Sequence, residues 1–295
     1  MDEYHLKNQT ILWLLMFLLM ACTSTPSQQM RNTQAQGLTV QHGWSKVALE
    51  TDYFTLQTFM PNAISKTDVL TIYIEGDGLA WRSAYSPSTN PTPSNPLALK
   101  LALLDTGPVV YLARPCQYIE ENQSKNCIPK YWTSHRFSAE VIASTNQAMD
   151  LIKSKFGAQK LTLVGYSGGG AVAALVAAKR SDVIKLITVA GNLDHAYWTK
   201  QQHLSPLSGS LNAADVWMDL QKTPQRHYVG DQDSTIGKDI AQSYASQFII
   251  NKQPSITVIP NFDHHCCWES IWPSIVNTDF GDLPAIQHNI VIKKK

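Results

Sequence analysis

The chain has 295 residues, of which 44% are hydrophobic and 16% are charged. This composition is ordinary for a globular protein, and the length suits one large α/β domain or two smaller ones. The 24 basic residues nearly balance the 23 acidic ones, and the one block of like charge is the lysine run at 293–295. The charge pattern therefore gives no support to a nucleic-acid partner.

An apolar run at residues 11–20 lies close to the start of the chain. It is too short to span a bilayer as a helix and is typical of the apolar core of a secretory signal. The run ends in LMAC (19–22), which resembles a bacterial lipobox, whose cysteine becomes the lipidated first residue after cleavage. We expect a signal peptide over 1–21 and a lipid on Cys22 that binds the protein to a membrane. A plain signal peptide or a short anchor is the alternative.

Thr23 follows the lipobox cysteine, where an aspartate would favour the inner membrane, so we expect the outer membrane and the periplasm. Residues 22–45 are polar and lack helical or strand periodicity, which predicts a flexible tether. The folded domain is then expected over 46–295.

Apolar runs alternate with helical patterns through the rest of the chain. The expected strands are 54–60, 69–76, 108–113, 160–166, 184–191, 225–231 and 255–260. The expected helices are 96–104, 138–157, 168–180, 236–249 and 266–276. This alternation predicts an α/β fold with a mostly parallel central sheet flanked by helices.

Three long segments interrupt the alternation, at 79–95, 114–137 and 192–224. Each follows an expected strand, so in a parallel sheet all three would gather over the carboxyl edge, where open α/β sheets bind ligands. Their aromatic residues could line an apolar pocket or simply pack the loops together; they are Trp81, Tyr118, Tyr131, Trp132 and Trp198.

The stretch GYSGG (165–169) has the pattern G-x-S-x-G and lies between an expected strand and an expected helix. In this arrangement the serine occupies a strained turn that exposes its hydroxyl, and the glycines avoid collisions there. The N-terminus of the following helix favours negative charge. Ser167 is therefore a candidate nucleophile, against the alternative of a glycine-rich packing turn with an idle serine.

A serine nucleophile needs a base and an acid. GDQD (230–233) follows one late strand and NFDHH (261–265) follows the last one, and together with GYSGG they resemble the α/β-hydrolase superfamily over about 46–280. The resemblance implies that Ser167 is the nucleophile, Asp233 the acid and His264 the base. Asp231 is the second candidate acid, and His265 should point elsewhere.

The loop EGDG (75–78) follows the strand 69–76 in the place where such hydrolases carry an oxyanion donor. We expect the backbone N–H of Asp77 or Gly78 to pair with that of Gly168. An ordinary glycine turn is the alternative. Smaller stretches, RPCQY (114–118), YWTSHRF (131–137) and HHCCW (264–268), resemble exported bacterial serine hydrolases of unassigned substrate.

Four cysteines besides Cys22 would experience an oxidising compartment in an exported protein. We predict a disulfide between Cys116 and Cys127, which would close a polar loop. Cys266 and Cys267 could form a vicinal disulfide or remain two buried thiols. Together with the two adjacent histidines they lack the spacing of a metal site, so no metal and no cofactor is expected.

These features predict a serine hydrolase, most simply an esterase or lipase, that acts on a small-molecule or lipid acyl substrate through an acyl-enzyme. A peptidase or acyltransferase could use the same residues. A surface lipoprotein that keeps the fold without catalysis is the alternative from another class.

Overall fold

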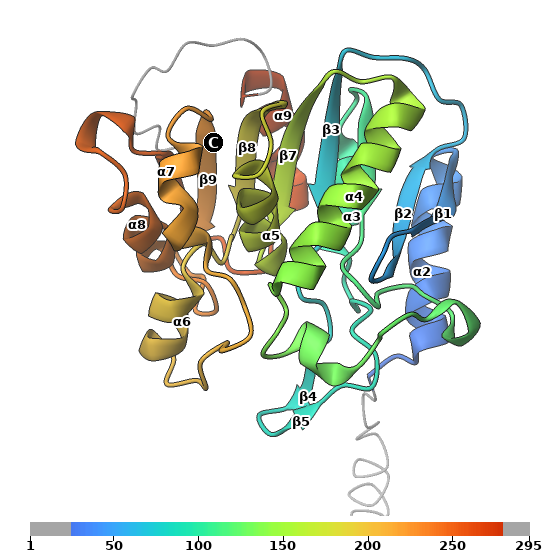
Figure 1. Cartoon of the computed structure of the whole chain (residues 1–295), viewed down its shortest axis with the longest axis horizontal. Helices are drawn as coiled ribbons and strands as arrows, with labels where there is room; N and C mark the ends of the chain where they lie inside the picture. The colour runs from blue at the N-terminus through green and yellow to red at the C-terminus, as the bar shows by residue number, and fades with distance from the viewer. Residues whose placement is uncertain (1–24, 280–295) are drawn as a thin grey trace, which may run out of the picture.

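Residues 25–279 are described by the computed structural model shown in Figure 1. The expected signal peptide, the lipidation site Cys22 and the last residues of the chain lie outside this range. Within it, no helix is both long enough and apolar enough to cross a membrane.

An eight-stranded sheet forms the centre of the fold, in the order β1-β2-β6-β3-β7-β8-β9-β10. Strand β2 is antiparallel to both of its neighbours, and all other adjacent pairs are parallel, which confirms the prediction of a mostly parallel sheet. The strands are β1 (Trp44–Glu50), β2 (Thr55–Pro61), β3 (Val69–Ile74), β6 (Val109–Leu112), β7 (Lys160–Tyr166), β8 (Val183–Val189), β9 (Gln225–Gly230) and β10 (Ser255–Ile259).

Helices cover both faces of the sheet, each over its own hydrophobic cluster. In Figure 1, α4 and α5 lie in front of the sheet, with α3 and α9 behind it. The first face carries α4 (Ala139–Phe156), α5 (Gly168–Ala177), α7 (Trp217–Leu220) and α8 (Lys238–Ala245), and the second carries α2 (Gln28–Gln41), α3 (Leu97–Leu104) and α9 (Trp268–Asp279).

Local sequence explains helices α4 and α5. Helix α4 has an acidic residue, Glu140, in its first turn and ends at Gly157, which adopts the left-handed conformation (φ 65°) that glycine tolerates without strain. Every residue of α5 is buried, and its sequence GGGAVAALVA consists of small and apolar side chains. Small side chains let α5 approach the sheet closely, which fixes the position of the turn that precedes it.

The segments 79–95 and 114–137 and the first part of 192–224 lie at the carboxyl edge of the sheet, whereas the last part of 192–224, with α7, runs back to the opposite end and enters β9, which is parallel to β8. They include the hairpin of β4 (Trp81–Ser83) and β5 (Ser86–Pro87) and the helix α6 (His195–Gln201), both at the lower end of the sheet in Figure 1. The segments bind one another: Trp132 Nε1 donates to the carbonyl oxygen of Ser88 over 3.1 Å, and Ser210 Oγ donates to that of Ser134 over 2.9 Å.

The prediction of a flexible tether up to residue 45 is wrong, because α2 occupies Gln28–Gln41 and β1 begins at Trp44. Ser27 caps the helix by accepting a hydrogen bond from the N–H of Met30. The inner face of α2 is held mainly by polar contacts: Arg31 donates to the carbonyl oxygen of Asn90 over 3.3 Å, and Asn32 donates to Glu120 over 3.1 Å. A helix anchored in this way lacks the apolar periodicity by which sequence patterns indicate helices.

Candidate active site

Ser167 lies at the turn between β7 and α5, in a strained backbone conformation with φ 52° and ψ −123°. The flanking glycines are required by close packing: a Cβ on Gly165 would come within 2.4 Å of the Gly169 carbonyl oxygen, and one on Gly169 within 2.3 Å of the Ile74 carbonyl oxygen. The side chain of Ser167 makes no capping bond to α5, so its hydroxyl is available for other partners.

His264 and Asp233 complete a chain of hydrogen bonds with this serine. The Oγ atom of Ser167 lies 3.0 Å from Nε2 of His264, and Nδ1 of the same ring lies 2.8 Å from Oδ2 of Asp233. The Asp233 side chain is fully buried, and its other oxygen accepts the backbone N–H groups of Thr235 and Ile236, each over 2.8 Å. A carboxylate fixed on both oxygens holds the imidazole in one orientation, with Nε2 free to accept the serine proton.

The neighbouring carboxylates Asp231 and Asp263 have other partners. Asp231 accepts the backbone N–H of Asn261 over 2.6 Å, and Asp263 accepts those of His265 and Cys266, both over 2.7 Å. Both carboxylates therefore shape the loop that carries the histidines. Burial, together with the nearby His264, lowers the pKa of His265.

Tyr166, the variable residue of the G-x-S-x-G pattern, contacts both histidines of the loop after β10. Its hydroxyl donates to the carbonyl oxygen of His264 over 3.1 Å and lies 2.9 Å from Nδ1 of His265. Its ring lies 5.4 Å from the ring of His264. The residue before Ser167 thus connects the loop that carries the histidines to the end of β7.

The loop after β3 runs beside Ser167. A Cβ on Gly76 would lie 3.2 Å from the Cβ of Ser167, and one on Gly168 would lie 2.1 Å from Oδ1 of Asp77, so Asp77 and Gly168 are in direct contact. Gly78 instead packs against the carbonyl of Pro91 in the left-handed conformation (φ 64°). Of the two expected donors in this loop, Asp77 is therefore the one adjacent to Gly168.

The carboxylate of Asp77 forms two ion pairs that sequence reasoning missed. Arg136 Nη1 lies 2.5 Å from Oδ2, and Arg114 Nη1 lies 3.2 Å from Oδ1. Burial opposes ionisation of Asp77, but Arg136 and Arg114 outweigh it and hold the pKa of the carboxyl below its usual value. Gln117 adds a donor to the carbonyl oxygen of Gly76 over 2.9 Å. The only sequence signal was the pair of stretches RPCQY and YWTSHRF, which contain these three residues.

Glu75 is a second missed residue, buried one position before the glycine of this loop. It accepts the N–H of Gly76 over 2.9 Å and the hydroxyl of Tyr111 over 3.1 Å. Burial raises the pKa of Glu75 to about 7, although these bonds and the N–H groups of Ala98 and Leu99 oppose the shift. The carboxyl therefore joins the start of α3 to the start of the loop after β3.

Most of the aromatic loop residues pack the loops together. Tyr118, Tyr131 and Trp132 are buried, and the hollow that Tyr131 and Trp132 border beside Asp77 has a volume of only about 10 Å³. Trp198 differs, because its Nε1 donates to the carbonyl oxygen of Thr235 over 2.8 Å, two residues after Asp233.

The structure joins Cys116 to Cys127 by a disulfide, with Cα atoms 5.5 Å apart, a separation typical of such bridges. Cys266 and Cys267 are joined as a vicinal disulfide, and both are exposed, so they are not two buried thiols. Within residues 25–279, no group of three or more His, Cys, Asp or Glu side chains is arranged to hold a metal ion.

Comparison with solved structures shows that the chain has the α/β-hydrolase fold. An α/β serine hydrolase without a lid from Xanthomonas campestris is 13% identical with a TM-score of 0.52, over 83% of this chain and 97% of that one. An esterase from Pyrococcus furiosus is 13% identical with a TM-score of 0.54, over 81% and 91%. An α/β hydrolase from a Penicillium species is 13% identical with a TM-score of 0.55, over 80% and 96%.

No family model matches the sequence, and no curated protein matches it. The fold is therefore established by structure, and the chemistry has to be argued from the site.

Proposed function

We propose that this chain, which has the α/β-hydrolase fold, is a serine hydrolase that cleaves a carboxylic ester or a related acyl substrate through an acyl-enzyme. One observation carries the proposal: the hydrogen bonds of 3.0 Å and 2.8 Å that link Ser167 to His264 and His264 to Asp233. An esterase or lipase is the simplest form of this activity.

In the proposed reaction Ser167 Oγ attacks the acyl carbonyl carbon while His264 takes the hydroxyl proton. Asp233 accepts the other N–H of the ring and stabilises the imidazolium. The backbone N–H groups of Asp77 and Gly168 would stabilise the oxyanion. His264 then donates this proton to the leaving alcohol. In the second half of the reaction His264 takes a proton from a water molecule, which attacks the acyl-enzyme, and then gives the proton to Ser167 Oγ.

Two alternatives share parts of this proposal. A peptidase or acyltransferase would use the same acyl-enzyme and differ only in leaving group or acceptor. A lipoprotein that keeps the fold only for binding has no need of the hydrogen-bonded serine, histidine and aspartate, which argues for the enzyme.

Labelling with a fluorophosphonate tests for an activated serine, and a panel of acyl esters, thioesters and peptidyl amides identifies the reaction. Ser167→Ala should abolish labelling and turnover, whereas Ser234→Ala, which changes an exposed serine beside the acid, should preserve both. Equal labelling of Ser167→Ala and the unmodified protein would refute the proposal.

The assignment of the base has its own test. His264→Ala should lower kcat by about 10⁴-fold or more, which is about 5 kcal/mol of transition-state stabilisation, and His265→Ala should retain most of the turnover. An inactive His265→Ala beside a normal His264→Ala would move the assignment by one residue.

We also propose that Cys22 carries a lipid that anchors the enzyme to the outer membrane, facing the periplasm. The proposal is supported by the apolar run at 11–20 and the lipobox-like LMAC. Cys22→Ser should abolish incorporation of labelled palmitate in a bacterial host, and unchanged labelling would rule the anchor out.

A further inference from the structure

The loop after β3 and the turn at Ser167 meet at the side chain of Asp77. The backbone N–H of Asp77 is one of the two proposed oxyanion donors, and that of Gly168 is the other. The carboxylate of Asp77 lies directly against Gly168, since a Cβ there would come within 2.1 Å of Oδ1. Oxyanion donors have to lie about 2.7–3.1 Å from the oxygen on which the charge develops. The position of this carboxylate therefore affects how well the two N–H groups fit one oxygen atom.

Two arginines fix this carboxylate, one on each oxygen. Arg136 Nη1 lies 2.5 Å from Oδ2 of Asp77, and Arg114 Nη1 lies 3.2 Å from Oδ1. Arg136 is itself held in place, because its Nε donates to the carbonyl oxygen of Thr133 over 2.7 Å. Its own carbonyl oxygen accepts a hydrogen bond from Nη2 of Arg114, so the two arginines also hold each other.

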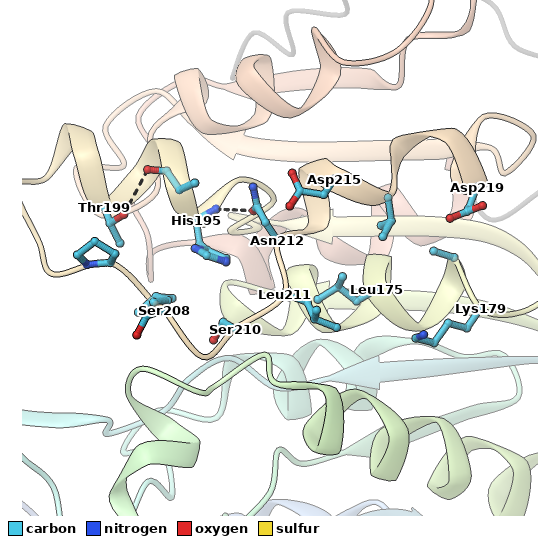
Figure 2. Close-up of a pocket in the computed structure, with 15 residues that line it drawn as sticks. Leu175, Lys179, His195, Thr199, Ser208, Ser210, Leu211, Asn212, Asp215 and Asp219 are labelled. Atoms are coloured by element: carbon cyan, nitrogen blue, oxygen red, sulfur yellow. Dashed lines mark hydrogen bonds between the residues drawn. The ribbon is translucent and has the colours of Figure 1, made fainter.

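The arginines have no room to bind a substrate themselves. The hollow beside Asp77 and Arg114 has a volume of only about 10 Å³, which is space for about one water molecule. A cavity of about 580 Å³ lies between α5 and the segment 192–224, and Figure 2 shows Leu175 among the side chains that line it. Neither Arg114 nor Arg136 is among the described residues in that lining. Both arginines therefore act through the carboxylate that they contact.

Arg136 also contacts the loop that carries the acid, through one aromatic side chain. Its guanidinium carbon lies 6.0 Å from the centre of the Trp198 ring, and Trp198 Nε1 donates to the carbonyl oxygen of Thr235 over 2.8 Å. The N–H of Thr235 in turn donates to Oδ1 of Asp233 over 2.8 Å. Arg136 is thus connected to the loop with the oxyanion donor and to the loop with the acid.

We propose that Arg136 is a positioning residue for the oxyanion donors, and that it acts through the carboxylate of Asp77. A buried ion pair adds little net stability over apolar side chains of the same volume, and its best-attested use is to fix one arrangement of the chain. The arrangement fixed here is the approach of Asp77 to Gly168. This inference rests on the proposed serine hydrolase function, and its effect falls on the transition state.

Two hexyl ketones probe the oxyanion donors without an ester to cleave. When trifluoromethyl hexyl ketone reacts, Ser167 Oγ bonds to the carbonyl carbon and the hydroxyl proton passes to His264. The electron pair of the broken carbonyl π bond moves to the oxygen, which becomes an oxyanion, so the inhibition constant of this ketone reports on the donors. Methyl hexyl ketone binds mainly as the trigonal ketone and is the reference for ground-state binding.

Arg136→Met keeps most of the side-chain volume and removes the guanidinium. With para-nitrophenyl butyrate as substrate, we expect kcat/KM per active site to fall at least about tenfold. The inhibition constant of the trifluoromethyl ketone should rise by the same factor, and that of the methyl ketone should change little. Active sites are counted by fluorophosphonate titration, so unfolded molecules do not lower the measured rate.

Arg180→Met is the matched control. The side chain of Arg180 is 7% exposed, as is that of Arg136, and it also pairs with two carboxylates, Asp150 and Asp182. Arg180 follows the C-terminal end of α5, whereas Ser167 precedes the N-terminal end. This variant should lose stability but keep kcat/KM per active site and both inhibition constants.

A folded Arg136→Met with unchanged kcat/KM would overturn the inference, as would a loss of kcat/KM without the matching rise for the trifluoromethyl ketone. An equal loss in Arg180→Met would overturn it too. If Arg136→Met does not fold, Asp77→Asn takes its place, with the same expected and the same refuting results. These outcomes refute the positioning role alone, whereas an unmodified protein that neither reacts with fluorophosphonate nor cleaves the ester refutes the proposed function and this inference with it.

Discussion

Replacing Asp77 by asparagine removes the carboxylate that both Arg114 and Arg136 contact. The three side chains are 17%, 5% and 7% exposed, so the change leaves two guanidinium groups buried beside each other without their anion. Removal of one partner from a buried ion pair costs about 3–5 kcal/mol. The asparagine oxygen can still accept one of the two hydrogen bonds, so we expect the loss of stability to lie at the lower end of this range, at about 3 kcal/mol. In a domain of this size that corresponds to a fall in Tm of about 6–12 °C.

Denaturant unfolding of the purified protein at pH 7 measures this loss. Asp150→Asn is the matched control, because the Asp150 side chain is 59% exposed in its pair with Arg180 and should contribute about 0–1 kcal/mol. The folded-state pKa of Asp77 lies below its ordinary value of 3.8, so its contribution is present above pH 3.8 and is lost as the pH falls through the folded pKa. The difference between the two proteins should therefore narrow below about pH 3.8. An Asp77→Asn variant no less stable than Asp150→Asn at pH 7 would refute the reasoning.

Three further predictions follow from named contacts. The pKa of Glu75 is about 7 against an ordinary 4.5, so the free energy of unfolding should fall by about 3 kcal/mol as the pH rises between these values. Urea unfolding at several pH values should show this fall for the unmodified protein and not for Glu75→Gln, and the same pH dependence in both proteins would contradict the prediction. Changing both Cys116 and Cys127 to serine should lower the unfolding free energy by about 2–3 kcal/mol. Peptide mapping of the unmodified protein without reduction should find the two cysteines linked, whereas separately alkylated peptides would rule the bridge out. Tyr166→Phe should lower kcat about tenfold with KM unchanged, because it removes the hydroxyl that donates to the carbonyl oxygen of His264 and helps to hold that residue in place. A change confined to KM would instead assign Tyr166 to substrate binding.

Much of the architecture follows from short-range patterns. The central strands are mostly apolar runs, and GYSGG marks the turn at Ser167 because the glycines there meet neighbouring backbone atoms. Asp233 and His264 each follow a late strand, where the resemblance to α/β-hydrolases placed the acid and the base, and in the structure both are linked to Ser167 by hydrogen bonds. Predictions of this kind succeed where the signal lies within a few residues of the feature.

The features that the sequence did not predict depend on distant partners. Arg114 and Arg136 are 37 and 59 residues from Asp77, and no local pattern links a charge to a partner at such separations. Helix α2 was missed for the same reason, since its polar inner face is explained only by partners on the loops it covers.

The early start of α2 changes what a lipid on Cys22 would do. Helix α2 begins at the same end of the sheet as the β4–β5 hairpin and α6, and Gln28 and Arg31 bind the loops of that end through Ile119 and Asn90. Between Cys22 and Gln28 the chain can reach at most about 20 Å. A flexible tether running to residue 45 would let the end of the sheet that carries Ser167 turn away from the bilayer. A connection of only about 20 Å would instead hold that end close to the lipid surface. The acyl groups of that same membrane would then meet Ser167 at a high effective concentration.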